Sequence, residues 1–190
     1  MRNLFKVTMT ALIGLFMVVG LQAQNEHPAK KEHPSSNEHP AKKEAKASPA
    51  KEASGKIGDA TITINYSSPG VKGRNIWGEL VPLNKVWRAG ANEATTFKTD
   101  KDLLVEGKEL PAGTYSFFVI PHEDATATVI FNKEADQWGA MKYDESKDAL
   151  RVNVYPSQSN MTERLEYKVN DDGIVMAWEY YKLPIKIKVK

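Results

Sequence analysis

Polar side chains gather around a glycine near the middle of the chain, at Gly90. Arg88 offers a planar fork of donors, Asn92 both donors and acceptors, and Glu93 a pair of acceptor oxygens. Farther along, an irregular polar stretch carries two aromatic residues that would add a stacking face. Together these residue types predict a site for a sugar or a carboxylate, made of Arg88, Asn92, Glu93, Thr95, Trp138 and Tyr143.

A structural interpretation of the same residues stands beside the binding one. Arg88 and Glu93 would then form an ion pair that holds a loop, and Asn92 would satisfy the backbone of a turn. Thr95 and Thr96, the last polar residues of the cluster around Gly90, are ordinary strand residues in this interpretation. Tryptophans 77, 87 and 178 are typical of core packing, whereas Trp138 fits either interpretation.

Carboxylates near this cluster raise the alternative of a glycosidase-like hydrolase. Such enzymes place two acids about 5 Å apart when retaining and about 6.5–9.5 Å apart when inverting. Glu93 is the first candidate, and a partner would come from Glu79, Asp144 or Asp148. No catalytic residue is assigned, because sequence alone does not bring two of these acids together.

Other chemistries find little support in the composition. The chain contains no cysteine, which excludes disulfides and thiolate chemistry. His122 is the single histidine after residue 56, so neither a catalytic triad nor a zinc site is predicted, and no cofactor is expected. Residues 57–190 carry 17 Lys or Arg against 19 Asp or Glu, an acidic balance that disfavours nucleic-acid binding.

The N-terminus has the three parts of a secretory signal peptide. Arg2 and Lys6 are positive, Val7 to Leu21 is apolar, and the chain then reaches a small residue at Ala23. The alternative is a membrane anchor, but a spanning helix needs about 20 apolar residues and polar residues interrupt this run. We therefore expect residues 1–23 to be cleaved and the mature protein to be periplasmic or extracellular, without a transmembrane segment.

The next segment, residues 24–56, is low in complexity. The triplet Glu-His-Pro recurs with a period of six, at Glu26, Glu32 and Glu38, among alanines and lysines. Such a composition does not bury enough apolar area to offset the entropy of ordering, so the segment is predicted to be a disordered linker. Its three histidines could bind a metal ion, but a flexible chain would lose entropy in forming such a site. We therefore expect a solvated spacer.

From residue 57 onward the pattern is that of short strands. Ala60 to Tyr66 alternates with period two, and Thr114 to Ile120 is rich in β-branched and aromatic residues. Asn132 to Asp148 is the longest non-strand stretch and the place for a short helical turn. At the end of the chain, Leu183 to Val189 alternates apolar residues with lysines, which suits an edge strand. We count about nine strands and predict an all-β protein, an antiparallel β-sandwich over residues 57–190.

Several segments of this domain together resemble one known family. They are Arg74 to Pro82, Val86 to Phe97, Leu110 to Ser116, Phe131-Asn132 and Gln137 to Gly139. Over nearly all of residues 57–190 the chain resembles DUF2911, a domain of unknown function found in exported bacterial proteins. The resemblance implies a β-sandwich and a location in the cell envelope, and it brings no established activity or catalytic residue.

Three functions follow from these observations as hypotheses. The first is a non-enzymatic binding module for carbohydrate or another small polar ligand. The second is a hydrolase that uses Glu93 with a second carboxylate. The third is a structural or assembly protein of the envelope, which would present an exposed apolar patch to a partner.

Overall fold

A computed structural model describes residues 47–190, so the predicted signal peptide and most of the predicted linker lie outside the described residues. The described part is built almost wholly of strands, with one short 3₁₀ helix, η1 (Glu145–Lys147). The strands are β1 (Ala50–Ile57), β2 (Ala60–Ser67), β3 (Thr95–Thr99), β4 (Leu103–Val105), β5 (Lys108–Leu110), β6 (Gly113–Pro121), β7 (Ala127–Asn132), β8 (Asp148–Val154), β9 (Ser157–Asn170) and β10 (Gly173–Val189). No helix among these residues is long and apolar enough to cross a membrane.

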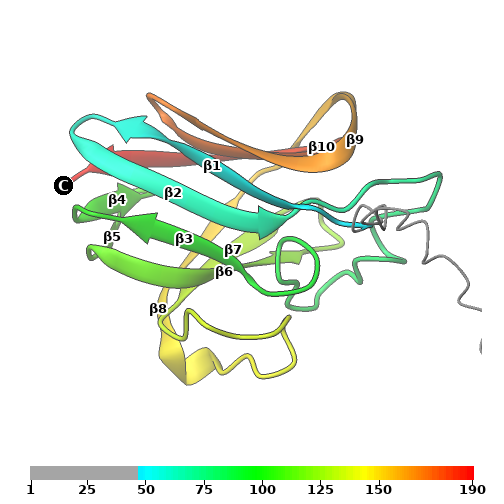
Figure 1. Cartoon of the computed structure of the whole chain (residues 1–190), viewed down its shortest axis with the longest axis horizontal. Coiled ribbons are helices and arrows are strands. Elements are labelled where there is room, and N and C mark those ends of the chain that lie inside the picture. The colour runs from blue at the N-terminus through cyan, green and yellow to red at the C-terminus, as the bar shows by residue number, and fades with distance from the viewer. Residues whose placement is uncertain (1–46) are drawn as a thin grey trace, which may run out of the picture. The chain divides into compact units, whose positions relative to one another are not determined.

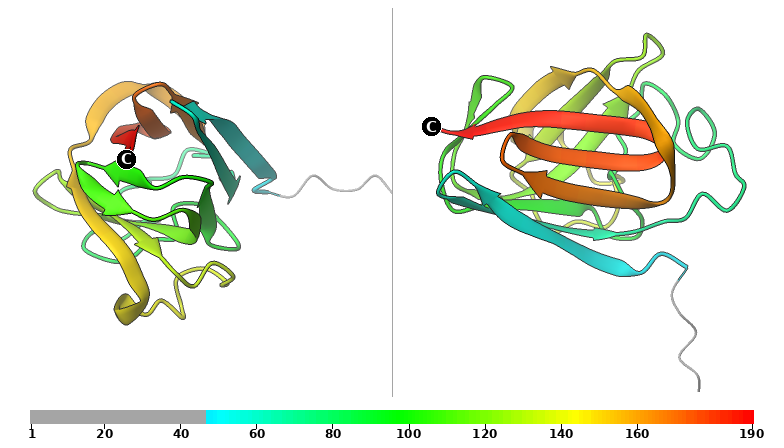
Figure 2. Two further views of the ribbon diagram at one scale, coloured as in Figure 1. Left: turned by 90° about the vertical axis from the view of Figure 1, so that its left-hand side faces the viewer. Right: turned by 90° about the horizontal axis from the view of Figure 1, so that it is seen from above.

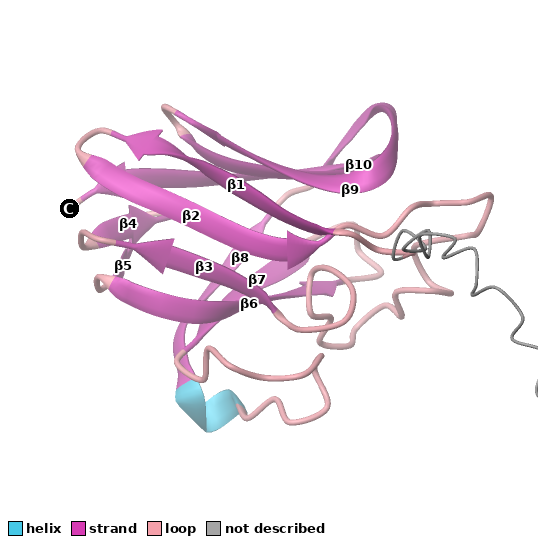
Figure 3. Ribbon diagram, viewed as in Figure 1, coloured by secondary structure: helices cyan, strands magenta, loops and turns pink. Residues whose placement is uncertain are grey.

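The strands form two antiparallel sheets that face each other (Figure 1). The larger sheet has the order β1-β2-β3-β6-β7-β8, and the smaller one has the order β5-β4-β10-β9. Figure 3 shows the single helical turn below the larger sheet, within the predicted irregular stretch. The prediction of an all-β antiparallel sandwich is confirmed.

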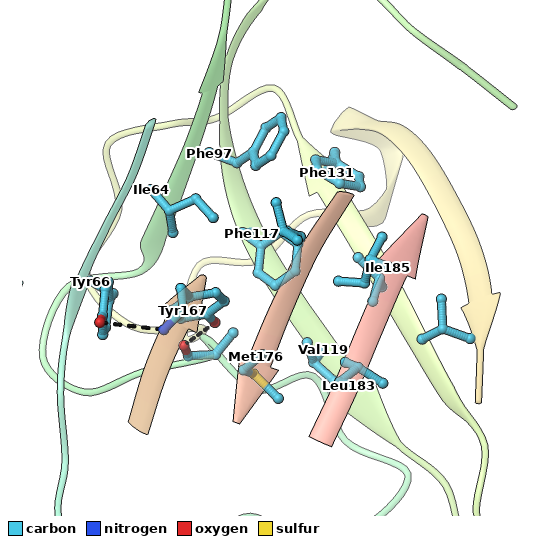
Figure 4. Close-up of a cluster of buried hydrophobic side chains, with 14 of the residues drawn as sticks. Ile64, Tyr66, Phe97, Phe117, Val119, Phe131, Tyr167, Met176, Leu183 and Ile185 are labelled. Carbon is cyan, nitrogen blue, oxygen red and sulfur yellow. Dashed lines mark hydrogen bonds between the residues drawn. The ribbon is translucent and has the colours of Figure 1, made fainter. Parts of the chain in front are cut away.

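The core lies between the sheets and follows from the period-two pattern of the strands. In β2, Ile62 and Ile64 are buried, Thr63 between them is half-buried, and Thr61 and Asn65 on either side are exposed. Large side chains from the two sheets meet in the middle, among them Phe97, Phe117, Phe131, Met176, Leu183 and Ile185 (Figure 4). Each buried side chain of this size stabilises the fold by about 1.5–3 kcal/mol. The alternation therefore dictates which face of each strand points inward.

Strand β1 corrects the predicted boundary between linker and domain. The strand starts at Ala50, within the segment 24–56 predicted to be disordered, and pairs with β2 along its whole length. Two of its inward positions, Ala53 and Gly55, carry small residues, because the opposing strand passes close by. A Cβ atom at Gly55 would lie 2.9 Å from the Cβ of Val169. The residue types that make β1 resemble a linker are thus the ones that its packing requires.

Strands β9 and β10 change the predicted position of the last residues of the chain. The N-terminal end of β9 pairs with Lys182 and its C-terminal end with Gly173, so β9 bends around β10 (Figure 2). Strand β10 doubles back at Glu179, where φ is 57°, and Ile187 N–H donates to the carbonyl of Asp172 at 3.0 Å. The last residues of the chain therefore lie between β4 and β9, not at the predicted sheet edge. Their charged side still faces solvent, as the alternation indicated.

The segment between β7 and β8, residues 133–147, covers part of the outer face of the larger sheet. Beneath it a second apolar cluster forms around Phe118, Ile120 and Ile130, with Tyr143 packed against it. The ring of Tyr143 meets that of Phe118 edge to face, at 5.2 Å between centroids. The covering segment leaves the part of this face near β1 exposed, and that difference shapes the candidate site.

Candidate functional site

A line of polar residues runs straight across the outer face of the larger sheet. Each member stands directly opposite the next on the neighbouring strand. Outward positions are where polar side chains are expected in a sheet with one buried face. We call the line the polar row; from β1 to β8 it consists of Glu52, Asn65, Thr96, Ser116, Asn132 and Asp148.

The half of the row under the covering segment is fully hydrogen-bonded. Asn132 donates to the carbonyl of Asp144 at 2.9 Å and to the carboxylate of Asp148 at 2.8 Å. Its own amide oxygen accepts from Glu134 N–H at 3.0 Å, and Ser116 Oγ donates to Glu134 O at 2.7 Å. Because Ser116 and Asn132 are completely buried, these bonds replace water that the two side chains have lost. We call this half the covered end.

Asp148 closes the covered end with two further contacts. Tyr143 Oη donates to Asp148 Oδ2 at 2.6 Å, and Arg151 Nη1 lies 3.3 Å from the same oxygen. Glu145 adds a second carboxylate to Arg151 at 2.7 Å. Burial, and then the hydrogen bond to Asp148, raises the pKa of Tyr143 well above its usual value. The predicted ligand residue Tyr143 is therefore placed in a structural contact, where its hydroxyl is engaged.

The other half of the row borders a groove of about 460 Å³. Glu52, Asn65 and Thr96 line it, and Glu93 lines it from the loop that leads into β3. None of these four side chains has a hydrogen bond or ion pair within residues 47–190. We call this half the open end, and the hollow beside it the open groove.

The predicted ion pair between Arg88 and Glu93 is not found among residues 47–190. Glu93 is exposed and faces the open groove. Arg88 turns the other way, toward the covering segment, where a Cβ at Gly139 would lie 3.6 Å from its Nη1 atom. The structural interpretation of these two residues as a single staple is therefore wrong.

Asn92 and Thr95 hold the loop that carries Glu93. Asn92 adopts a left-handed backbone, with φ of 59°, and donates from its amide to Ser67 Oγ at 3.1 Å. Thr95 is fully buried and donates to the carbonyl of Ala89 at 2.9 Å, an oxygen that also accepts from Tyr167 Oη. Both side chains thus position the loop. Asn92 does so through Ser67 at the end of β2, whereas the structural interpretation predicts a bond to the backbone of its own turn.

The segment around Trp138 lies alongside the loop around Glu93. Ala94 N–H donates to Gln137 O at 3.0 Å, and a Cβ at Gly139 would lie 3.9 Å from Asn92 O. These two contacts bracket Glu93 and Trp138 and place them opposite each other. Trp138 is 57% exposed. The structure therefore brings together the segments of Arg88, Asn92, Glu93 and Trp138, and leaves Thr95 in the core and Tyr143 at the covered end.

The match to known families agrees with these boundaries. The model of DUF2911, described as a protein of unknown function, matches residues 48–187. The chain belongs to the DUF2911 family. No curated protein and no solved structure matches it. The matched region includes β1, so the DUF2911 domain begins before the predicted boundary at residue 57.

Sequence reasoning missed two residues of this DUF2911 site, namely Glu52 and Asn65. Glu52 falls in the predicted linker, and Asn65 looks like an ordinary outward strand residue. Thr96 belongs to the polar cluster around Gly90, but its type alone marks it only as a strand residue. One local signal was present: Gly58-Asp59 is a two-residue hairpin turn between β1 and β2, with Gly58 at a φ of 59°. Recognising it would have placed β1 in the domain and Glu52 beside Asn65.

The remaining histidine of the DUF2911 domain sits in a separate polar hollow. His122 contacts Asn84 Oδ1 at 3.2 Å and Thr128 Oγ1 at 2.8 Å. Within residues 47–190 there is no group of three or more His, Asp or Glu side chains that could hold a metal ion. The three linker histidines lie outside the described residues.

Proposed function

We propose that this DUF2911 protein is a non-enzymatic binding module whose open groove takes a carbohydrate or another small polar ligand. One observation carries the proposal. Five polar side chains line the open groove without partners of their own among residues 47–190, namely Lys51, Glu52, Asn65, Glu93 and Thr96. The polar groups at the covered end of the same row are all engaged.

The chemistry of the open groove suits hydroxyl-rich ligands. The carboxylates of Glu52 and Glu93 accept hydrogen bonds from hydroxyl groups, while Asn65 and Thr96 both donate and accept. Three of these residues stand on paired strands, which hold their side chains in place before binding and so reduce the entropy lost on association. The volume lies within the range of about 300–1,000 Å³ common for small-molecule sites.

Trp138 lies next to the open groove without lining it, and its side chain borders a separate hollow with Lys142 and Lys147. It would contribute to carbohydrate binding only where a sugar extends past Glu93. It is an exposed aromatic residue on the segment opposite Glu93, and aromatic faces pack against the apolar side of a sugar ring. Tyr143 is placed differently, because its hydroxyl is engaged by Asp148 and its ring by Phe118. The proposed binding residues are therefore Glu52, Asn65, Glu93 and Thr96, with Trp138 beside them.

The test is a glycan array, followed by titration of the best sugar against purified variants. Glu93→Gln and Asn65→Ala should each weaken binding by about tenfold or more, since each removes hydrogen bonds to the ligand. Glu123→Gln is the matched control, because Glu123 is exposed and outside the open groove. A sugar bound equally well by all three variants would show that the groove is not its site.

A hydrolase is the second candidate, and one observation favours it. Glu52 and Glu93 line the same groove, so Glu93 has a nearby acid that was not among its predicted partners. The three predicted partner acids make other hydrogen bonds: Glu79 accepts from Asn75, Asp144 caps η1, and Asp148 accepts from Tyr143. Turnover of chromogenic glycosides that disappears in both Glu52→Gln and Glu93→Gln would establish an enzyme, whereas binding without turnover supports a binding module.

We also propose that the protein is exported and works outside the cytoplasm. The basis is the signal-like sequence of residues 1–23, which lie outside the described residues. Mass spectrometry of protein recovered from the envelope fraction should find Gln24 as the N-terminus. Recovery of the full-length chain from the cytoplasm would contradict export.

A further inference from the structure

Four aromatic side chains, two from the loop between β2 and β3 and two from β10, form a cluster. Trp87 stacks on Trp178 with 5.8 Å between ring centroids, and Trp77 stacks on Tyr181 at 4.2 Å. Trp77 also meets both other indoles edge to face. The rings therefore pack against one another through their faces, and their polar atoms are the groups that still need hydrogen-bond partners.

Those polar atoms are not matched within residues 47–190. Four buried donors have no hydrogen-bond partner there: the indole N–H groups of Trp77 and Trp178, the hydroxyl of Tyr181 and Nε of Arg88. Only one other buried side-chain atom in the described residues, Oε1 of Gln137, is in the same state. Buried donors are nearly always bonded in folded proteins, so this concentration of unmatched donors marks the region as unusual.

A small pocket of about 170 Å³ lies next to the cluster, and we call it the arginine pocket. Arg88 and Trp178 are in its lining, although the unmatched Nε of Arg88 and Nε1 of Trp178 are themselves buried and do not reach its open space. The pocket is well below the size that drug-sized ligands need, so it suits a small molecule. Its main walls are Arg74, Leu80, Val81, Trp87, Arg88 and Trp178.

The charge of the arginine pocket is entirely positive. Arg74 and Arg88 line it, no Asp or Glu does, and neither arginine forms an ion pair within residues 47–190. Arg74 is held in place by donating to the carbonyls of Val71 and Gly70, at 3.1 and 2.5 Å. Backbone carbonyls orient a guanidinium without neutralising it. Two positive charges at a partly apolar pocket therefore have no negative group to compensate them, and an anionic ligand would supply one.

From this geometry we infer that the arginine pocket is a second binding site, for a small organic anion with a planar apolar body, such as an aromatic carboxylate. The carboxylate would pair with the guanidinium groups of Arg74 and Arg88, and the apolar body would lie against Trp87, Leu80 and Val81, with Trp178 behind them in the pocket wall. A cation is disfavoured by the two arginines. The pocket shares no lining residue with the open groove, so this inference is independent of the proposed function.

The test uses the indole N–H signals of the full-length protein in ¹H–¹⁵N NMR spectra, titrated with benzoate and phenylacetate. Both carboxylates should shift the Trp178 signal in a saturable way at millimolar concentration. Trp138, which is exposed and outside the pocket, is the internal control and should not shift. Benzyl alcohol, which is neutral, should bind at least about tenfold more weakly, and choline should not bind, since hydrogen bonds to charged partners are the stronger ones.

Variants then assign the site. Arg88→Met should weaken benzoate binding by about tenfold to a hundredfold, whereas Lys98→Met, which removes a positive charge from the outer face of β3, should leave it unchanged. Arg88→Lys keeps the charge and loses the planar fork, so it should give an intermediate affinity and serves if Arg88→Met does not fold. The inference is overturned if neither carboxylate shifts Trp178, if benzyl alcohol or choline binds as well as benzoate, or if Arg88→Lys binds as tightly as the wild type.

Discussion

The covered and open ends of the polar row occupy equivalent positions on one sheet, yet they differ in burial and in hydrogen bonding. At the covered end, Ser116 and Asn132 are buried and each of their bonds has a defined partner in residues 133–148. At the open end, Asn65 and Glu52 are exposed and make no bond within residues 47–190. The same strand register thus produces structure where a segment lies over it and leaves a candidate site where none does.

Burial separates structural from functional polar residues in this fold. A buried polar group must be bonded, because leaving it unmatched costs about 1–3 kcal/mol. An exposed one is hydrated and costs nothing to leave without a protein partner. We therefore expect substitutions at the covered end to lower the stability of the fold, and substitutions at the open end to alter binding alone.

The largest effect is expected for Asn132→Ala. The substitution removes three part-buried hydrogen bonds, to the carbonyl of Asp144, the carboxylate of Asp148 and the N–H of Glu134. We expect the free energy of unfolding to fall by about 3 kcal/mol, measured by urea denaturation. A loss below about 0.5 kcal/mol would mean that the covering segment does not depend on the row beneath it.

Tyr143→Phe should come next, with a loss of about 2 kcal/mol at pH 7, because it removes a hydrogen bond to the charged Asp148. The folded state raises the pKa of Tyr143, so its contribution is complete below the ordinary tyrosine pKa of about 10 and declines as the pH rises above it. The stability difference between wild type and variant should therefore shrink in alkaline solution.

The control for this second prediction is Tyr155→Phe, since Tyr155 is 76% exposed and has no side-chain partner among residues 47–190. It should leave stability unchanged at pH 7. If the difference between wild type and Tyr143→Phe instead stays constant up to high pH, the hydroxyl of Tyr143 is not held by Asp148 in solution.

Ser116→Ala should cost about 1 kcal/mol, less than the two changes above. Only one bond is lost, and its acceptor, the carbonyl of Glu134, keeps the amide of Gln137 as a second donor at 2.7 Å. Chemical denaturation alongside Asn132→Ala measures both on one scale. Asn132→Ala should lose more free energy of unfolding than Ser116→Ala, and the reverse order would contradict the hydrogen-bond pattern.

The smallest effects on stability belong to the open end. Asn65→Ala and Thr96→Val should each change the free energy of unfolding by no more than about 0.5 kcal/mol, because neither side chain has a partner to lose. Thermal melts of both variants beside wild type would detect a larger change. Destabilisation comparable to that of Ser116→Ala would show that the open end is structural too, and would remove the contrast on which the binding proposal is built.

Much of the fold was predictable from local patterns. The alternation in β2 and the β-branched and aromatic run in β6 indicated strands that the structure contains, and the irregular stretch before β8 does hold one helical turn. The prediction failed where tertiary contacts overrule composition. Ala53 and Gly55 suffice for β1 only because β9 passes so close to it.

The candidate site was predictable only in part. Arg88, Asn92, Glu93 and Trp138 lie on two segments that are indeed adjacent, but Arg88 and Glu93 face different hollows. Glu52 and Asn65 acquire meaning from strand register, a relation between residues far apart in the chain. No local pattern announces such a relation except the Gly58-Asp59 turn, which implies that the strands on either side of it pair.

The sequence by itself determined the all-β class, the membership in the DUF2911 family and the inward face of most strands, because period-two alternation and turn residues act over a few positions. Only the tertiary structure decided which polar residues are occupied and which are available. That distinction depends on where residues 133–147 lie over the sheet, and on how the loop before β3 divides Arg88 from Glu93. Burial and partnership are properties of the assembled sandwich, since both require neighbours that the chain supplies from distant positions.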